Sequence, residues 1–69
     1  MKLPLKAARA YADMTQQDVA DALGLTRETI RAYEGYKSYP DSRTIVKLLA
    51  LYGLTFDQIA WTRDKDSTQ

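Results

Sequence analysis

Apolar residues recur every three or four positions along most of the chain, and this spacing is typical of helices that bury one face. The pattern predicts five short helices and no strands. The first runs from about Leu5 to Ala12, and the others follow the capping residues Thr15, Thr26, Asp41 or Ser42, and Thr55. The expected fold class is therefore all-α, a compact bundle of five helices whose apolar stripes face a shared core.

The second and third helices have the clearest boundaries. Thr15 and Asp18 stand three residues apart, as in a capping box that opens a helix. Gly24 ends this helix, because glycine adopts the left-handed conformation of a helix C-terminus without strain. Thr26 then caps the next helix, and Gly35 follows as its stop signal.

Only the three residues Gly24-Leu25-Thr26 separate these two helices. A connection this short, with glycine first and an apolar residue second, makes two helices cross at a steep angle. The apolar residues Ile30 and Tyr33 anchor the later helix on the core, so its opposite face protrudes. The major groove of DNA is about 12 Å wide and admits one α-helix. Residues Thr15–Glu34 are therefore predicted to form a helix-turn-helix.

The protruding face of the later helix carries side chains that suit base edges in the major groove. The candidate base readers are Arg27, Glu28, Thr29, Arg31 and Ala32. Arginine pairs with guanine, a carboxylate accepts from the cytosine amine, and methyl groups contact thymine. An ordinary solvated helix face carries similar charges, so these residues alone leave both interpretations open.

Flanking positions suit the sugar-phosphate backbone, which fixes the register of a bound helix. Gln16 stands at the positive end of the second helix, and Thr26 caps the third. Tyr36, Lys37 and Ser38 follow the third helix and would meet the backbone on its other side. A lysine in this loop is also consistent with a purely solubilising role.

The composition narrows the class of function. Sixty-nine residues form one domain, for which we expect a helix-turn-helix domain over residues 1–61 and a flexible polar tail over 62–69. The chain has no cysteine and no histidine, so we expect no metal, no cofactor and no enzymatic activity. The net charge is only +1, which argues against binding DNA by charge alone, although the first two-thirds of the chain is mildly basic.

The sequence carries no sign of membrane insertion or export. No apolar run approaches the ~20 residues that span a bilayer, and the N-terminus lacks the apolar stretch of a secretory signal. We therefore expect a cytoplasmic protein.

The segment Met14–Glu34 resembles the helix-turn-helix of the lambda-repressor-like family, also called the XRE or Cro/repressor family. The shared features are Thr15-Gln16 at the start of the second helix, Ala20, Gly24, Ile30 and Glu34. Further similar features are Pro40 and the segments Thr44–Leu49 and Leu51–Asp57. The resemblance covers about Leu5 to Trp61 and suggests a phage-type member, which would act at the nucleoid of a bacterial host cell.

The resemblance implies a five-helix fold and roles for particular residues. It implies a phosphate contact from Gln16 and base contacts from Arg27, Glu28 and a residue like Ala32. It also implies an ion pair between Arg9 and Glu34, which would brace the recognition helix and leave Arg9 able to reach a phosphate.

This chain departs from the family pattern in one loop. The family usually has glycine two residues after the glutamate, whereas this chain has Tyr36 there and Gly35 one position earlier. The sequence therefore leaves open the path of this loop and the role of Lys37.

The first functional hypothesis is a phage-type regulator, Cro-like or repressor-like, that binds an operator in double-stranded DNA as a homodimer. A second capping box, Thr55 with Gln58, opens the last helix. Phe56, Gln58 and Trp61 are its expected dimer surface, with core packing as the alternative.

The second hypothesis is a protein-interaction module on the same fold. Such a module would be an anti-repressor or co-regulator that binds a partner repressor, or an antitoxin. The weak net charge, the acidic Glu28 and the small Ala32 on the exposed helix keep this hypothesis open.

Overall fold

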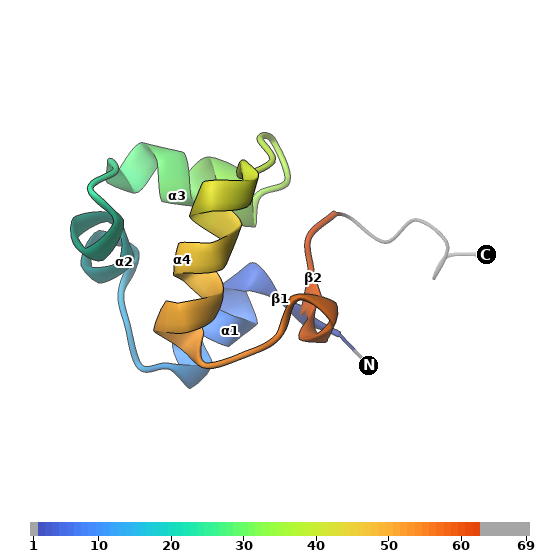
Figure 1. The fold of residues 1–69 in the computed structure, drawn as a ribbon. Coiled ribbons are helices and arrows are strands. Elements are labelled where there is room, and N and C mark those ends of the chain that lie inside the picture. The colour runs from blue at the N-terminus through green and yellow to red at the C-terminus, as the bar shows by residue number, and fades with distance from the viewer. Residues whose placement is uncertain (1, 63–69) are drawn as a thin grey trace.

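The computed structural model describes residues 2–62 and contains four α-helices in that range, one 3₁₀ turn and two short strands (Figure 1). The helices are α1 Leu5–Tyr11, α2 Gln16–Leu23, α3 Arg27–Glu34 and α4 Ser42–Tyr52. The strands are β1 Leu3–Pro4 and β2 Ile59–Ala60, and the 3₁₀ turn η1 spans Phe56–Gln58. The mostly helical prediction is confirmed, and residues 63–69 of the expected tail lie outside the described range.

Side-chain caps begin α2, α3 and α4, as the sequence indicates. The Thr15 hydroxyl accepts from the backbone N–H of Asp18 at 3.0 Å, and the Asp18 carboxylate accepts from the N–H of Thr15 at 3.0 Å. Thr26 caps α3 by accepting from the N–H of Thr29. At α4 the cap is Asp41, not Ser42, since Asp41 accepts from the N–H of Thr44 at 2.8 Å.

The segment after α4 differs from the expected fifth helix. Gln58 does accept from the backbone N–H of Thr55, as in the predicted capping box, but the turn spans only Phe56–Gln58. The backbone becomes extended at Ile59, with φ −113° and ψ 138°, and pairs in parallel with β1. This pairing supplies backbone hydrogen bonds that a longer helix would otherwise make, so the expectation of five helices without strands was wrong here.

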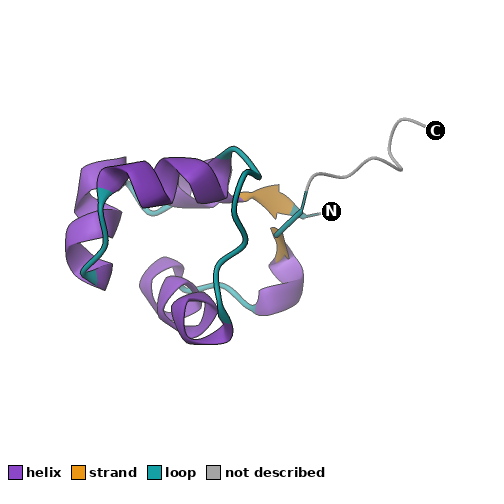
Figure 2. Cartoon of the chain, turned by 90° about the horizontal axis from the view of Figure 1, so that it is seen from above, coloured by secondary structure: helices purple, strands orange, loops and turns teal. Residues whose placement is uncertain are grey.

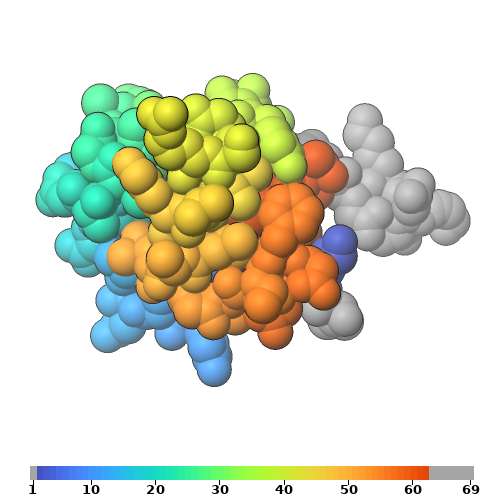
Figure 3. Space-filling model, viewed as in Figure 1, coloured from blue at the N-terminus to red at the C-terminus, as the bar shows by residue number. Residues whose placement is uncertain are grey.

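One apolar core joins the four helices to β2 and Trp61. Its buried members are Leu5, Ala8, Val19, Ala20, Ile30, Leu48, Tyr52, Ile59 and Trp61. The strands lie at one side of the helices, next to each other (Figure 2). In the space-filling view, α1, α2, α4 and the C-terminal turn lie side by side on one face of the molecule (Figure 3). Among residues 2–62, no helix is long and apolar enough to cross a membrane.

Candidate nucleic-acid interface

The turn between α2 and α3 sets the direction of α3. Gly24 has φ 71°, and the next amide, on Leu25, donates to the carbonyl of Ala20 at 2.8 Å. Leu25 packs against the core, so the chain reverses tightly and α3 crosses over the end of α2 (Figure 1). Ile30, only 2% exposed, fastens α3 to the core by one face. The opposite face of α3 is therefore presented to solvent.

The candidate base readers divide into two groups on α3. Arg27, Glu28 and Arg31 are exposed, whereas Thr29 and Ala32 are half-buried. Arg31 Nη1 lies 3.6 Å from Glu28 Oε1, and both side chains are mostly exposed, at 66% and 74%. A pair this open to water is weak and exchanges readily for other partners. Three side chains are thus able to extend beyond α3, two of them cationic.

Arg9 of α1 and Glu34 at the end of α3 come together in the fold. Arg9 Nε lies 2.6 Å from Glu34 Oε2, and Arg9 Nη2 donates to Glu34 Oε1 at 3.3 Å. Arg9 Nη1 also donates to the carbonyl of Met14 at 2.9 Å. The hydrogen bond with Glu34 raises the pKa of Arg9 above its ordinary value, against the lowering effect of burial. These bonds tie the C-terminal end of α3 to α1 and to the loop before α2.

Gln16, the expected phosphate contact, has a protein partner that the sequence did not reveal. Its amide Nε2 donates to Glu34 Oε1 at 3.0 Å. The two residues are 18 positions apart on separate helices, so no local pattern links them. Their contact depends on how α2 and α3 cross. Arg9, Gln16 and Glu34 therefore form one hydrogen-bonded cluster that spans three helices, which we call the Glu34 cluster.

The backbone of the loop after α3 shows the path that the sequence left open. Gly35 has φ −88°, open to any residue, whereas Tyr36 has φ 62° in the left-handed region. The amides of Lys37 and Ser38 both donate to the carbonyl of Ala32, which closes the helix. The left-handed residue therefore stands two positions after Glu34, with tyrosine in place of glycine.

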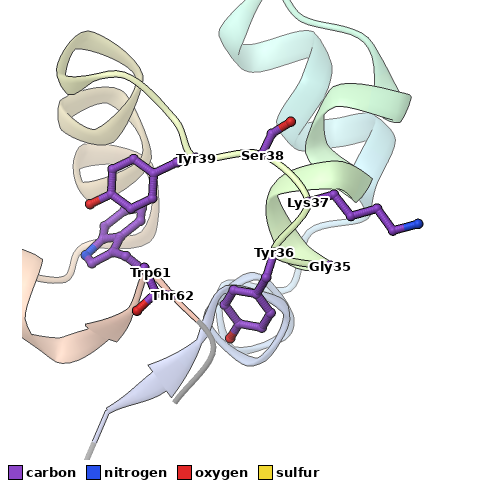
Figure 4. Close-up of a pocket in the computed structure, with 7 residues that line it drawn as sticks. All are labelled: Gly35, Tyr36, Lys37, Ser38, Tyr39, Trp61 and Thr62. Carbon is purple, nitrogen blue, oxygen red and sulfur yellow. The ribbon is translucent and has the colours of Figure 1, made fainter. Parts of the chain in front are cut away.

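The loop side chains point in different directions. Lys37 and Ser38 are exposed, and Lys37 extends away from the neighbouring aromatic rings (Figure 4). Those rings border an open pocket of about 590 Å³, lined by Gly35, Tyr36, Lys37, Ser38, Tyr39, Trp61 and Thr62. Of the expected backbone contacts after α3, Lys37 and Ser38 are fully accessible and Tyr36 is half-buried.

The three residues of the expected dimer surface occupy different environments. Phe56 is 48% exposed and Gln58 is exposed, whereas Trp61 is buried in the core of its own chain. The rings of Phe56 and Trp61 stack at 5.3 Å, and the Trp61 indole N–H donates to the carbonyl of Phe56. Any partner at this position would therefore meet Phe56, which stacks on Trp61, and Gln58.

Comparisons with known proteins agree with this geometry. The model of the helix-turn-helix family matches residues 5–59. An uncharacterized HTH-type transcriptional regulator of Methanocaldococcus jannaschii is 37% identical over 59 residues, covering 86% of this chain and 89% of that protein. No solved structure matches the chain significantly.

Two Bacillus subtilis proteins are also similar. The uncharacterized HTH-type transcriptional regulator YqaE is 34% identical over 55 residues, covering 80% of this chain and 47% of that protein. The SPbeta prophage-derived uncharacterized HTH-type transcriptional regulator YonR is 40% identical over 53 residues, covering 77% and 49%. The chain thus spans about half the length of these two relatives.

Proposed function

Because the chain belongs to the helix-turn-helix family, we propose that it is a DNA-binding transcriptional regulator that inserts α3 into the major groove of an operator. The observation that carries this proposal is the division of α3 into two faces. Ile30 is buried beneath the helix, while Arg27, Glu28 and Arg31 extend from it into solvent. The names of three relatives, all HTH-type transcriptional regulators, support the same function.

Sequence recognition is assigned to the exposed residues of α3. Arg27 and Arg31 suit the acceptor atoms of guanine, and Glu28 suits the amine of cytosine. Thr29 and Ala32 are half-buried, so they would contribute only short-range methyl contacts to thymine. A half-site containing G·C pairs opposite the two arginines is therefore expected.

Phosphate contacts would hold α3 in register on the duplex. Gln16 and Thr26 lie at the N-termini of α2 and α3, where unpaired backbone N–H groups favour anions. Lys37 and Ser38, exposed beyond the end of α3, would meet the backbone on the other side, beside Tyr36. Arg9 is 15% exposed at its side chain, which leaves only an edge of its guanidinium for a phosphate.

A Cro-like or repressor-like dimer is the assembly that this proposal favours. One such domain reads a half-site, and two domains one helical turn apart supply the usual affinity. Phe56 and Gln58 provide an exposed surface for the second copy. The prophage origin of one relative supports a phage-type regulator.

The proposal is tested by binding to DNA from the protein's own promoter region at increasing salt concentration. A protein that neutralises several phosphates should lose affinity linearly on a log–log plot, with a slope of about −0.9 per phosphate. Arg27→Ala and Arg31→Ala should each remove most of the preference for the operator over unrelated DNA. Lys47→Ala, which alters an exposed lysine on α4, is the matched control and should retain it.

The same experiment tests the alternative of a protein-interaction module. The net charge of +1, the acidic Glu28 and the small, half-buried Ala32 on α3 are the observations that favour it. Absence of DNA binding at any salt concentration, together with stoichiometric co-purification of a partner regulator, would replace the first proposal with this one.

A further inference from the structure

The Glu34 cluster points to a role for Glu34 that goes beyond bracing α3. We propose that Glu34 is a positioning residue for DNA binding, which fixes the side-chain amide of Gln16 with an N–H facing the phosphate backbone. This inference rests on the proposed function, because it concerns how the phosphate contact is prepared.

The hydrogen bonds define which end of the amide faces Glu34. The Glu34 carboxylate is 7% exposed at its side chain, and its Oε1 accepts from Gln16 Nε2 at 3.0 Å. An ionised carboxylate only accepts hydrogen bonds, so it selects the NH₂ group of the amide over the carbonyl. One N–H is used in this bond and the second remains available. Without such a partner, an amide turns either its donor or its acceptor toward a phosphate.

Arg9 fixes the position of the Glu34 carboxylate. It donates to both carboxylate oxygens, through Nε to Oε2 and through Nη2 to Oε1. A two-point contact of this kind fixes the plane of the carboxylate as well as its location. The third Arg9 bond, to the carbonyl of Met14, anchors the guanidinium beside the start of α2. Arg9 therefore fixes the orientation of Gln16 indirectly, by fixing the Glu34 carboxylate to which Gln16 donates.

The orientation matters because of where Gln16 lies. It is the first residue of α2, and the Thr15 hydroxyl occupies the N–H of Asp18. The backbone N–H of Gln16 has no partner within the helix, which makes this terminus receptive to an anion. A side-chain N–H held at the same terminus adds a donor to this backbone donor. The carbonyl end of the amide would instead repel a phosphate.

The next residue provides a natural comparison. Gln17 also donates through Nε2 to a carboxylate, Asp21 Oδ1, at 2.9 Å. That acceptor lies one turn away on α2 itself and is exposed, so this bond does not involve α3. Gln17→Ala is therefore the matched control for Gln16→Ala.

The test is a double-mutant cycle on operator affinity with Gln16→Ala, Glu34→Gln and the double variant. Gln16→Ala should weaken binding about tenfold, as expected for loss of a hydrogen bond to a charged group. Glu34→Gln should weaken it several-fold, because a glutamine at this position no longer selects the NH₂ end of Gln16. The double variant should bind no more weakly than Gln16→Ala, and Gln17→Ala should stay within about twofold of the parent.

Additive losses in the cycle would overturn the inference, since they would show that Glu34 acts independently of Gln16. An NMR measurement on the free protein provides a second arm that needs no DNA. The Gln16 side-chain NH₂ signals should be dispersed and protected in the parent and should approach those of a free amide in Glu34→Gln. Unchanged signals would overturn the inference even if the variant binds DNA poorly.

Two outcomes separate this inference from the proposed function. Loss of all specific DNA binding by the parent protein would refute both. Specific binding that depends on Arg31 but shows no coupling between Glu34 and Gln16 would refute only the inference. If Glu34→Gln does not fold, the dispersion and protection of the Gln16 NH₂ signals in the parent still test the bond to Glu34. Replacing single operator phosphates by methylphosphonate in complexes of the parent and Gln16→Ala then tests the phosphate contact that this bond prepares. At least one substitution must weaken the parent and spare Gln16→Ala. The inference is overturned if every substitution weakens the two proteins equally.

Discussion

At the residue scale, Tyr36 has a strained backbone conformation beside the proposed DNA interface. Its φ of 62° lies in the left-handed region, where a β-carbon crowds the backbone. Glycine would relieve this crowding, yet the neighbouring Gly35 has an ordinary φ of −88° and does not serve that purpose. The sequence shows that glycine stands one position earlier than in the family pattern. Only the structure shows that the left-handed conformation stays two positions after Glu34, at Tyr36.

This strain predicts the order of stability of two Tyr36 variants. Tyr36→Gly and Tyr36→Ala both remove the ring and its contacts, but only glycine relaxes the backbone. We expect Tyr36→Gly to be more stable than Tyr36→Ala by about 1 kcal/mol, measured by urea denaturation. Gly24→Ala is the control, because Gly24 has φ +71° and a β-carbon added there would meet no neighbouring atom within 4 Å, so it should lose a similar amount through the backbone alone. Equal stabilities of the two Tyr36 variants would contradict the prediction.

Tyr52 predicts a specific alkaline instability. Burial, and secondarily the charge of Glu34, raise the pKa of the Tyr52 hydroxyl from its ordinary value of 10.0 to about 12. Because the folded state holds this proton more tightly, the associated stability is fully present below pH 10 and is lost as the pH rises to about 12. Tyr52→Phe should therefore lose less stability than the parent between about pH 9 and pH 11.5, measured by urea denaturation at each pH. Parallel pH profiles for the two proteins would contradict this assignment.

At the element scale, the helices that local capping signals specify could be predicted from the sequence. The segment whose conformation depends on a partner far away in the chain could not. The caps Thr15, Thr26 and Asp41 act within three residues, and the structure has them as expected. Thr55 and Gln58 give the same local signal, yet the chain after Gln58 becomes a strand. The competing partner is β1, more than fifty residues earlier, and no local pattern contains it. The contact of Gln16 with Glu34 escaped prediction for the same reason.

The cap of α4 predicts a pH-dependent stability. Hydrogen bonds from Thr44 lower the pKa of the Asp41 carboxyl below its ordinary value of 3.8. The stabilisation by this charged cap is therefore present above pH 3.8 and is lost as the pH falls below it. Asp41→Ala should lower the melting temperature by several degrees at about pH 7, and the difference from the parent should shrink toward about pH 2.

Asp41→Asn separates the charge of this cap from its hydrogen bond. Asparagine still accepts from the N–H of Thr44 but does not titrate, so a smaller loss that does not vary with pH is expected. A difference between parent and Asp41→Ala that is the same at neutral and at strongly acidic pH would show that the charge of Asp41 contributes nothing.

At the scale of the whole molecule, the small core makes the C-terminal segment indispensable. Ile59 and Trp61 are buried with Leu5 and Leu48, so residues from both ends of the described range complete one core. A domain of this size buries only about 60% of its unfolded surface, which leaves little stability in reserve. Support for α3 therefore depends on the C-terminal segment as well as on the helix-turn-helix itself.

This dependence predicts a large effect of a substitution remote from α3. Ile59→Ala truncates a fully buried side chain and should cost about 2–5 kcal/mol, comparable with the whole stability of a small domain. We expect most of the helical circular dichroism and the DNA affinity to be lost together at physiological temperature. Ile59→Val is the matched control and should cost about 1 kcal/mol with the fold intact. If Ile59→Ala still unfolds cooperatively at close to the melting temperature of the parent, the helices are stable without this side chain.

The pairing of β1 with β2 also has a consequence for synthesis of the protein in the cell. Leu3 pairs with Ile59, so β1 cannot form its pair until β2 has been synthesised. The α-helices depend on neighbouring residues and form within about a microsecond, whereas this strand pair joins residues more than fifty positions apart. On the ribosome, Leu3 is exposed long before Ile59 has left the exit tunnel. The helix-turn-helix is therefore complete in sequence well before its supporting core is, and the finished domain forms only after translation has passed the strand.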